Sequence, residues 1–296
     1  MIGLNAGKSG VIFAARRYVI GSAGVVLGLL LLASLSLAQG AKPDDRFANI
    51  DLCNGLDRSS PEPQIKGCSA LIDAGGETST VMAIAYNNRG DAYSRKGDYD
   101  RAISDYDMAI KLNPDDAKPF NNRGAAYLRK GEYARALAEF AAALKLKPDY
   151  ASAFANRAET YEKTQDYARA AQDYDEAIRL QPNLETLWNG RCWVRAILGQ
   201  LQPALTDCDA ALRIQPDDAA AYDSRGFIYL KMGQLDAAIA DYNSALRVEP
   251  NLASAVYGRG LARLKKGDAA NGNADVAAAK KLEPKIAEEF SRYGIQ

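Results

Sequence analysis

The chain of 296 residues contains no histidine. A Ser-His-Asp or Cys-His nucleophile site therefore cannot be built, and the commonest neutral metal ligand and proton shuttle are missing. An excess of one charge is also lacking, because 37 basic residues balance 37 acidic ones, so nothing indicates nucleic-acid binding. An enzyme would have to use carboxylate, lysine or cysteine chemistry alone.

The N-terminal segment has the pattern of an export signal. An apolar run at residues 19–37 ends in small residues that a signal peptidase recognises. The basic residues before it are Lys8, Arg16 and Arg17. We expect a signal peptide over residues 1–38, cleaved after Ala38, and an exported protein, with the periplasm as the expected compartment. The alternative is an uncleaved membrane anchor, since about 20 apolar residues can span a bilayer.

A repeat of 34 residues organises the rest of the chain. Arginines recur at this spacing at Arg89, Arg123, Arg157, Arg191, Arg225 and Arg259. Prolines recur at Pro114, Pro148, Pro182, Pro216, Pro250 and Pro284. Two series without a slip do not arise by chance, so one structural unit is repeated six times.

Each period predicts a helical hairpin. Apolar and small residues recur at helical spacing on both sides of a turn at residues 96–98. Gly97 can adopt the left-handed conformation that ends the first helix, and Asp98 can cap the second. Because one hairpin cannot bury its own apolar side, stability has to come from stacking on neighbouring hairpins.

The period resembles the tetratricopeptide repeat. In the first repeat the signature positions hold Tyr86, Gly90, Tyr93, Ala102, Tyr106, Ala109 and Pro114. The resemblance implies an all-α, right-handed helical solenoid. Its repeats are expected at 83–116, 117–150, 151–184, 185–218, 219–252 and 253–286. Residues 39–82 are expected to hold a linker and a degenerate helical hairpin, and residues 287–296 a C-terminal capping helix.

One departure from the family pattern is itself regular. Arginine replaces the usual leucine before the small residue, and an acid follows sixteen residues later in every repeat. These acids are Asp105, Glu139, Asp173, Asp207, Asp241 and Asp275. We predict a ladder of structural ion pairs between the two helices of each hairpin. The alternative is a row of arginines that binds acidic ligands.

The four cysteines form two pairs of similar separation. Cys192 occupies the small-residue position of the fourth repeat and Cys208 its aromatic position, so they face each other across one hairpin. Cys53 and Cys68 stand in the degenerate hairpin with almost the same spacing. Behind an export signal, this arrangement predicts two structural disulfides. Four unpaired buried thiols remain the alternative, whereas a metal site would require all four to converge.

The resemblance implies a peptide-binding groove lined by the first helices. The two positions after the first aromatic residue of each repeat are expected to face this groove. In repeats one to three they hold asparagines that could bond a peptide backbone, namely Asn87, Asn88, Asn121, Asn122 and Asn156. The groove positions one and two helical turns further along change from polar and charged residues in the early repeats to apolar residues in the later repeats. Trp193 and Phe227 are the expected partner anchors there. The alternative is that such side chains pack between repeats.

These observations predict a protein-interaction scaffold without catalysis. No stretch long enough for a catalytic domain remains, and we expect no catalytic residues, cofactor or metal. The expected partner is a protein or peptide, with no nucleic acid and no small-molecule substrate, and a membrane only if the N-terminal segment stays uncleaved. The alternative function is an envelope chaperone or assembly factor that holds secreted polypeptides.

Overall fold

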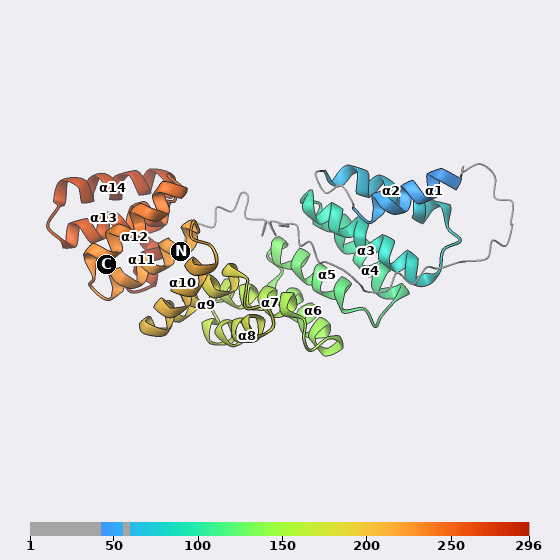
Figure 1. Cartoon of the computed structure of the whole chain (residues 1–296), viewed down its shortest axis with the longest axis horizontal. Coiled ribbons are helices and arrows are strands. Elements are labelled where there is room, and N and C mark those ends of the chain that lie inside the picture. The colour runs from blue at the N-terminus through green and yellow to red at the C-terminus, as the bar shows by residue number, and fades with distance from the viewer. Residues whose placement is uncertain (1–42, 56–59, 296) are drawn as a thin grey trace.

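The computed structural model of the chain describes residues 43–55 and 60–295. Within these ranges fifteen helices follow one another along an arc, without strands (Figure 1). The expected signal peptide lies outside the described residues. None of the helices in the described ranges is both long and apolar enough to cross a bilayer.

Each of the six predicted repeats holds one helical hairpin. The first helices are α3 (Ser79–Arg95), α5 (Ala117–Lys130), α7 (Ala151–Lys163), α9 (Glu185–Ile197), α11 (Ala219–Lys231) and α13 (Ala253–Lys265). The second helices are α4 (Tyr99–Leu112), α6 (Tyr133–Leu146), α8 (Tyr167–Leu180), α10 (Leu201–Ile214), α12 (Leu235–Val248) and α14 (Ala269–Leu282). The predicted all-α solenoid is therefore confirmed.

Two further parts close the array. α1 (Pro43–Cys53) and α2 (Pro61–Ala74) form the N-terminal hairpin and pack against α3. α3 begins before the expected repeat boundary, because Thr78 Oγ1 caps its start by accepting a hydrogen bond from Val81 N. α15 (Ile286–Arg292) is the helix in the region expected to cap the C-terminus. The solenoid thus has a helical element at each end.

The left-handed glycine of the predicted turn occurs in all described hairpins of the six repeats but the third, whereas the side-chain cap is made only by Asp98, Asp166 and Asp268. Gly97 has φ +81°, and Asp98 accepts a hydrogen bond from Arg101 N at 3.2 Å, which caps α4. The third repeat has Gln165 at the glycine position, with φ +63°. Because a side chain is disfavoured in this conformation, the third turn is the strained one.

Small residues allow the two helices of a hairpin to approach closely. A Cβ atom added to Gly90 would lie 2.7 Å from the ring of Tyr106, and Ala102 is fully buried beside that ring. The second repeat has the same arrangement, with Phe140 against Gly124. In these two repeats a glycine-aromatic contact is therefore at the centre of the hairpin packing.

The first helices form the inner side of the arc. α9, α11 and α13 contact one another across repeats, and so do α3, α5 and α7, whereas among the described helices the second helices of neighbouring repeats do not. Helices in contact occupy the shorter, inner path of a curved array. We call the surface of α3, α5, α7, α9, α11 and α13 the inner face.

Candidate partner-binding face

The asparagines of the inner face bind mainly to each other. Asn122 Nδ2 donates to Asn87 Oδ1, and Asn156 Nδ2 donates to Asn121 Oδ1, each at 3.0 Å. Asn87 and Asn121 are only 3% and 5% exposed. The expectation of a row of free amides is thus corrected, because these bonds link one repeat to the next. Asn88 is half-buried and makes no side-chain hydrogen bond to any described residue.

The asparagine row ends for a steric reason. In the fourth and sixth repeats its place is taken by Gly190 and Gly258. A Cβ atom would lie 2.5 Å from the Tyr174 ring at Gly190, and 2.3 Å from the Tyr242 ring at Gly258. A buried tyrosine of the preceding repeat therefore fills the space that an asparagine side chain would need.

The early repeats present charged groups on the inner face. Arg129 Nη1 lies 3.1 Å from Glu159 Oε1, which links the second repeat to the third. Asp91 keeps 48% of its side chain exposed, and Lys163 is exposed at the end of α7. This half of the inner face thus offers charges of both signs.

Two carboxyl groups beneath the inner face have raised pKa values. Burial raises the pKa of Glu162 to about 7, even though its Oε1 accepts a hydrogen bond from Tyr174 Oη at 2.5 Å. Burial likewise raises the pKa of Asp223 to about 7, and its Oδ2 accepts from Ser254 Oγ at 2.6 Å. Over residues 43–55 and 60–295, no group of three or more Cys, Asp or Glu side chains is placed to hold a metal ion.

The expected anchors Trp193 and Phe227 are covered by the chain itself. Their rings contact each other with centroids 5.0 Å apart, and Phe227 is 2% exposed. Tyr293 lies edge-on to Trp193 at 5.2 Å, and Phe290 edge-on to Phe227 at 5.8 Å. Phe227 is therefore closed to a partner in this structure, while Trp193 is half-buried, so the alternative that these rings pack within the chain holds for Phe227.

We call residues 286–295 the C-terminal segment. It lies on the inner face at α9, α11 and α13, and Figure 1 shows the C-terminus beside α11. The sequence pattern predicted only a cap here. The apolar spacing of Ile286, Phe290 and Tyr293 was the available signal for an amphipathic helix, yet it does not reveal where that helix binds.

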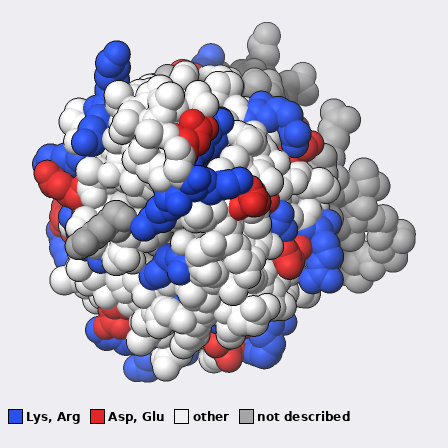
Figure 2. Space-filling view, turned by 90° about the vertical axis from the view of Figure 1, so that its left-hand side faces the viewer, with Lys and Arg blue, Asp and Glu red and all other residues white. Residues whose placement is uncertain are grey.

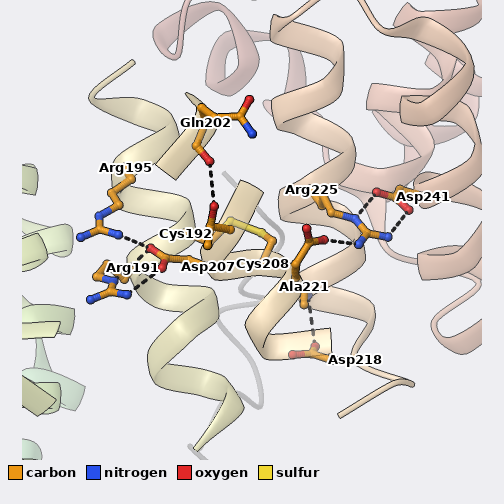
Figure 3. The surroundings of a disulfide bond; sticks show 12 residues. Arg191, Cys192, Arg195, Gln202, Asp207, Cys208, Asp218, Ala221, Arg225 and Asp241 are labelled. Carbon is orange, nitrogen blue, oxygen red and sulfur yellow. Dashed lines mark hydrogen bonds and ion pairs between the residues drawn. A yellow bond between two sulfur atoms is a disulfide. The ribbon is translucent and has the colours of Figure 1, made fainter. Parts of the chain in front are cut away.

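The arginine ladder is confirmed as a set of structural ion pairs. Arg191 Nε and Nη2 donate to the two carboxylate oxygens of Asp207 at 2.9 and 2.7 Å, and Arg225 binds Asp241 in the same way (Figure 3). In the second repeat Glu139 takes the place of aspartate. Because the guanidinium donors are used within the hairpins, the row is not a free site for acidic ligands.

The arginines also link neighbouring repeats, which the sequence reasoning missed. Arg191 Nη1 donates to Asp175 of the preceding repeat at 2.7 Å. The equivalent pairs are Arg123 with Asp107, Arg225 with Asp209, and Arg259 with Asn243. Arg157 lacks this link because Ala141 stands at the corresponding position. We call this contact the inter-repeat clamp.

Both cysteine pairs are joined in the structure. One disulfide links Cys53 to Cys68 between α1 and α2, and the other links Cys192 to Cys208 between α9 and α10 (Figure 3). This is the pairing that the repeat positions predict. All four side chains are buried, so the bonds lie in the hairpin cores.

Charges of both signs are dispersed over the C-terminal end of the solenoid. Figure 2 shows basic and acidic side chains separated by wide neutral areas on this face. No continuous surface of one sign is visible there.

Comparison with known families identifies the repeat. Residues 90–131 and 226–267 match the model of the TPR repeat, and residues 121–185 and 208–240 match two models of the tetratricopeptide repeat. A search of curated proteins found no match to the chain.

Solved structures share the fold at low identity. YrrB, described as a TPR protein with an unusual peptide-binding site, is 24% identical with a TM-score of 0.51, and the match covers 63% of this chain and 97% of YrrB. A tetratricopeptide repeat protein from Parabacteroides merdae ATCC 43184 is 19% identical with a TM-score of 0.62, covering 83% and 99%. A chain of the APC/C hetero-tetramer Cut9-Hcn1 is 16% identical with a TM-score of 0.65, covering 85% and 52%. At these identities the likeness establishes the fold alone.

Proposed function

Because the chain belongs to the tetratricopeptide-repeat family, we propose that it is a non-catalytic scaffold that binds a protein or peptide partner on its inner face. The observation that carries this proposal is the contrast between the two halves of that face. The later repeats are covered by the C-terminal segment, whereas Asp91 and Lys163 remain accessible in the early repeats. YrrB supports the proposal through its peptide-binding site.

The chemistry of the early repeats favours an extended segment with charged side chains. Asn88 can bond a peptide backbone, since an amide offers both donor and acceptor. Asp91 and Lys163 can pair with charges of the partner. Exposed pairs of this kind contribute more to specificity and association rate than to affinity. The early repeats would therefore select a partner by its charge pattern.

Capture of the partner from the native envelope fraction, with identification by mass spectrometry, tests this function. The inner-face variant Asn88→Ala/Lys163→Glu should recover at least about tenfold less partner than the unaltered chain. Lys145→Glu is the matched control, because Lys145 is exposed on the outer helix α6. Equal recovery with both variants would contradict the proposal. Recovery of many unrelated unfolded chains would instead favour the chaperone.

We also propose that the protein is exported, which the N-terminal pattern of basic and apolar residues supports. Two buried disulfides fit an oxidising compartment. N-terminal sequencing of the native protein should find a mature chain that begins near Gln39. An intact Met1 on a membrane-bound chain would favour the anchor.

A further inference from the structure

The C-terminal segment extends beyond what a cap requires. A cap needs to cover only the last hairpin, formed by α13 and α14. Phe290 does contact Tyr257 of α13, with ring centroids 4.9 Å apart. The segment continues, however, to Phe227 on α11 and Trp193 on α9. It thus occupies the inner face of three repeats.

The segment is amphipathic in the way of a peptide ligand. Its buried residues are Ile286, Phe290, Tyr293 and Ile295, with exposed fractions of 0%, 2%, 8% and 6%. Glu288, Ser291 and Arg292 are exposed on the opposite side. An isolated helix as short as α15 is unstable in water, so the face beneath it supplies its stability. The face therefore recognises apolar side chains at positions i, i+4 and i+7 of a helix.

Lys231 adds recognition of the ligand backbone. Its Nζ donates to the carbonyl oxygen of Tyr293 at 3.2 Å and to that of Ala196 at 3.3 Å. Tyr293 follows the last residue of α15, where helix carbonyls lack partners within the helix and favour a positive charge. This contact depends on no ligand side chain, so any short helix that ends at this place can make it.

The connection to the solenoid is short. Residues 283–285 join α14 to α15, and Pro284 and Lys285 in this link are exposed. Beyond the link, the segment is held by the side-chain contacts and the lysine bonds described above. Release of the segment would therefore expose Trp193 and Phe227 without unfolding a repeat.

We propose that the inner face of repeats four to six is a recognition site for a short amphipathic helix, which the C-terminal segment occupies in cis. The exchangeable occupant is a partner segment with apolar or aromatic residues at i, i+4 and i+7. Such a segment has to displace the chain's own residues, which makes the C-terminal segment an autoinhibitory ligand. This inference rests on the proposed function, since it names the regulation of the inner face.

A labelled peptide with the sequence of residues 286–296 tests the proposal on the full mature chain. It should bind the variant Phe290→Ala/Tyr293→Ala at least about tenfold more tightly than the unaltered chain, because the variant frees the site. Glu288→Ala/Ser291→Ala alters exposed positions of the same helix and should bind the peptide as weakly as the unaltered chain. A peptide with alanine at both aromatic positions should not bind.

Helix content and thermal unfolding show whether the double variant is folded. Tyr293→Ala is the second variant, since it removes only the ring beside Trp193 and leaves Phe290 and Ile286 in place. It should bind the peptide with intermediate affinity and shift the tryptophan emission to longer wavelength. Failure of the peptide to bind either folded variant would overturn the proposal, and so would equal binding to the unaltered chain.

Two outcomes separate this proposal from related ones. A dimer of the unaltered chain that Phe290→Ala/Tyr293→Ala dissociates would place the segment in a second copy, which contradicts occupancy in cis. If the peptide binds the variant but no partner is captured by any form of the chain, the recognition site stands and the proposed scaffold function fails. Failure of the recognition-site proposal can therefore be distinguished from failure of the proposed scaffold function.

Discussion

Removal of the disulfide in the fourth repeat should make that repeat unfold locally before the other full repeats do. In the first and second repeats the hairpin core contains a glycine-aromatic contact, Tyr106 on Gly90 and Phe140 on Gly124. The fourth repeat has Cys192 and Cys208 at these positions. The disulfide therefore replaces a packing contact with a covalent one.

The expected loss of stability follows from the length of the loop that the disulfide closes and from the burial of its sulfur atoms. The bond closes a loop with a sequence separation of 16, which corresponds to about 3 kcal/mol in the chain-entropy model. Both sulfur atoms are fully buried, so Cys192→Ala/Cys208→Ala also leaves a small cavity that costs about 1 kcal/mol. We expect a local loss of about 4 kcal/mol in the alanine variant.

A matched variant tests whether packing alone can replace the crosslink. Cys192→Gly/Cys208→Phe copies the glycine-phenylalanine pair of the second repeat, so it restores the packing but not the crosslink. It should lose about 3 kcal/mol of crosslink stabilisation. The glycine adds a helix penalty of about 0.5–1 kcal/mol.

Native-state amide hydrogen exchange is the suitable assay, because the repeats of a solenoid do not unfold as one unit. Protection should fall first in α9 and α10, and a non-reducing peptide map should show the linked pair in the unaltered protein. A loss below about 0.5 kcal/mol in the alanine variant would refute this account. Equal loss in α3 and α4 would refute the locality of the effect.

Three further predictions concern single positions. Gln165→Gly should stabilise the third repeat by about 1 kcal/mol in urea unfolding, because glycine adopts the positive φ without strain. Ala141→Asp should add the missing inter-repeat clamp to Arg157 and protect α7 from hydrogen exchange by about 0.2–1 kcal/mol, whereas Ala141→Lys should not. Stability should fall as pH rises from about 4 to about 7, because native Asp223 keeps a proton that the unfolded chain has lost. Asp223→Asn should reduce that slope by about half, because Glu162 has the same raised pKa, and an unchanged slope would contradict the raised pKa of Asp223.

Contacts within one hairpin could be predicted from the sequence. The turn at Gly97, the cap at Asp98 and the pairing of Arg191 with Asp207 join residues at most sixteen positions apart. Such contacts follow from helix period and turn chemistry alone, and six copies of the same pattern made them visible. The all-helical solenoid follows directly, since each hairpin has to bury its apolar side on the next.

Contacts between repeats were predicted less well. The bonds of Asn122 to Asn87 and of Arg191 to Asp175 depend on the rotation between stacked hairpins. The sequence shows which polar residues lie on a helix, but not whether a neighbouring repeat reaches them. For this reason asparagines expected to be available for a ligand proved to be partners of one another.

Whether the apolar half of the inner face is open or covered was decided by tertiary structure alone. Spacing on the first helices predicted Trp193 and Phe227 on that face. Their cover comes from residues far along the chain, as the Lys231 bond to Tyr293 shows by spanning 62 positions. Whether a short helix at the end of the chain extends outward or folds back depends on the curvature of the assembled solenoid. No pattern within one repeat encodes that curvature, because it accumulates over all of them.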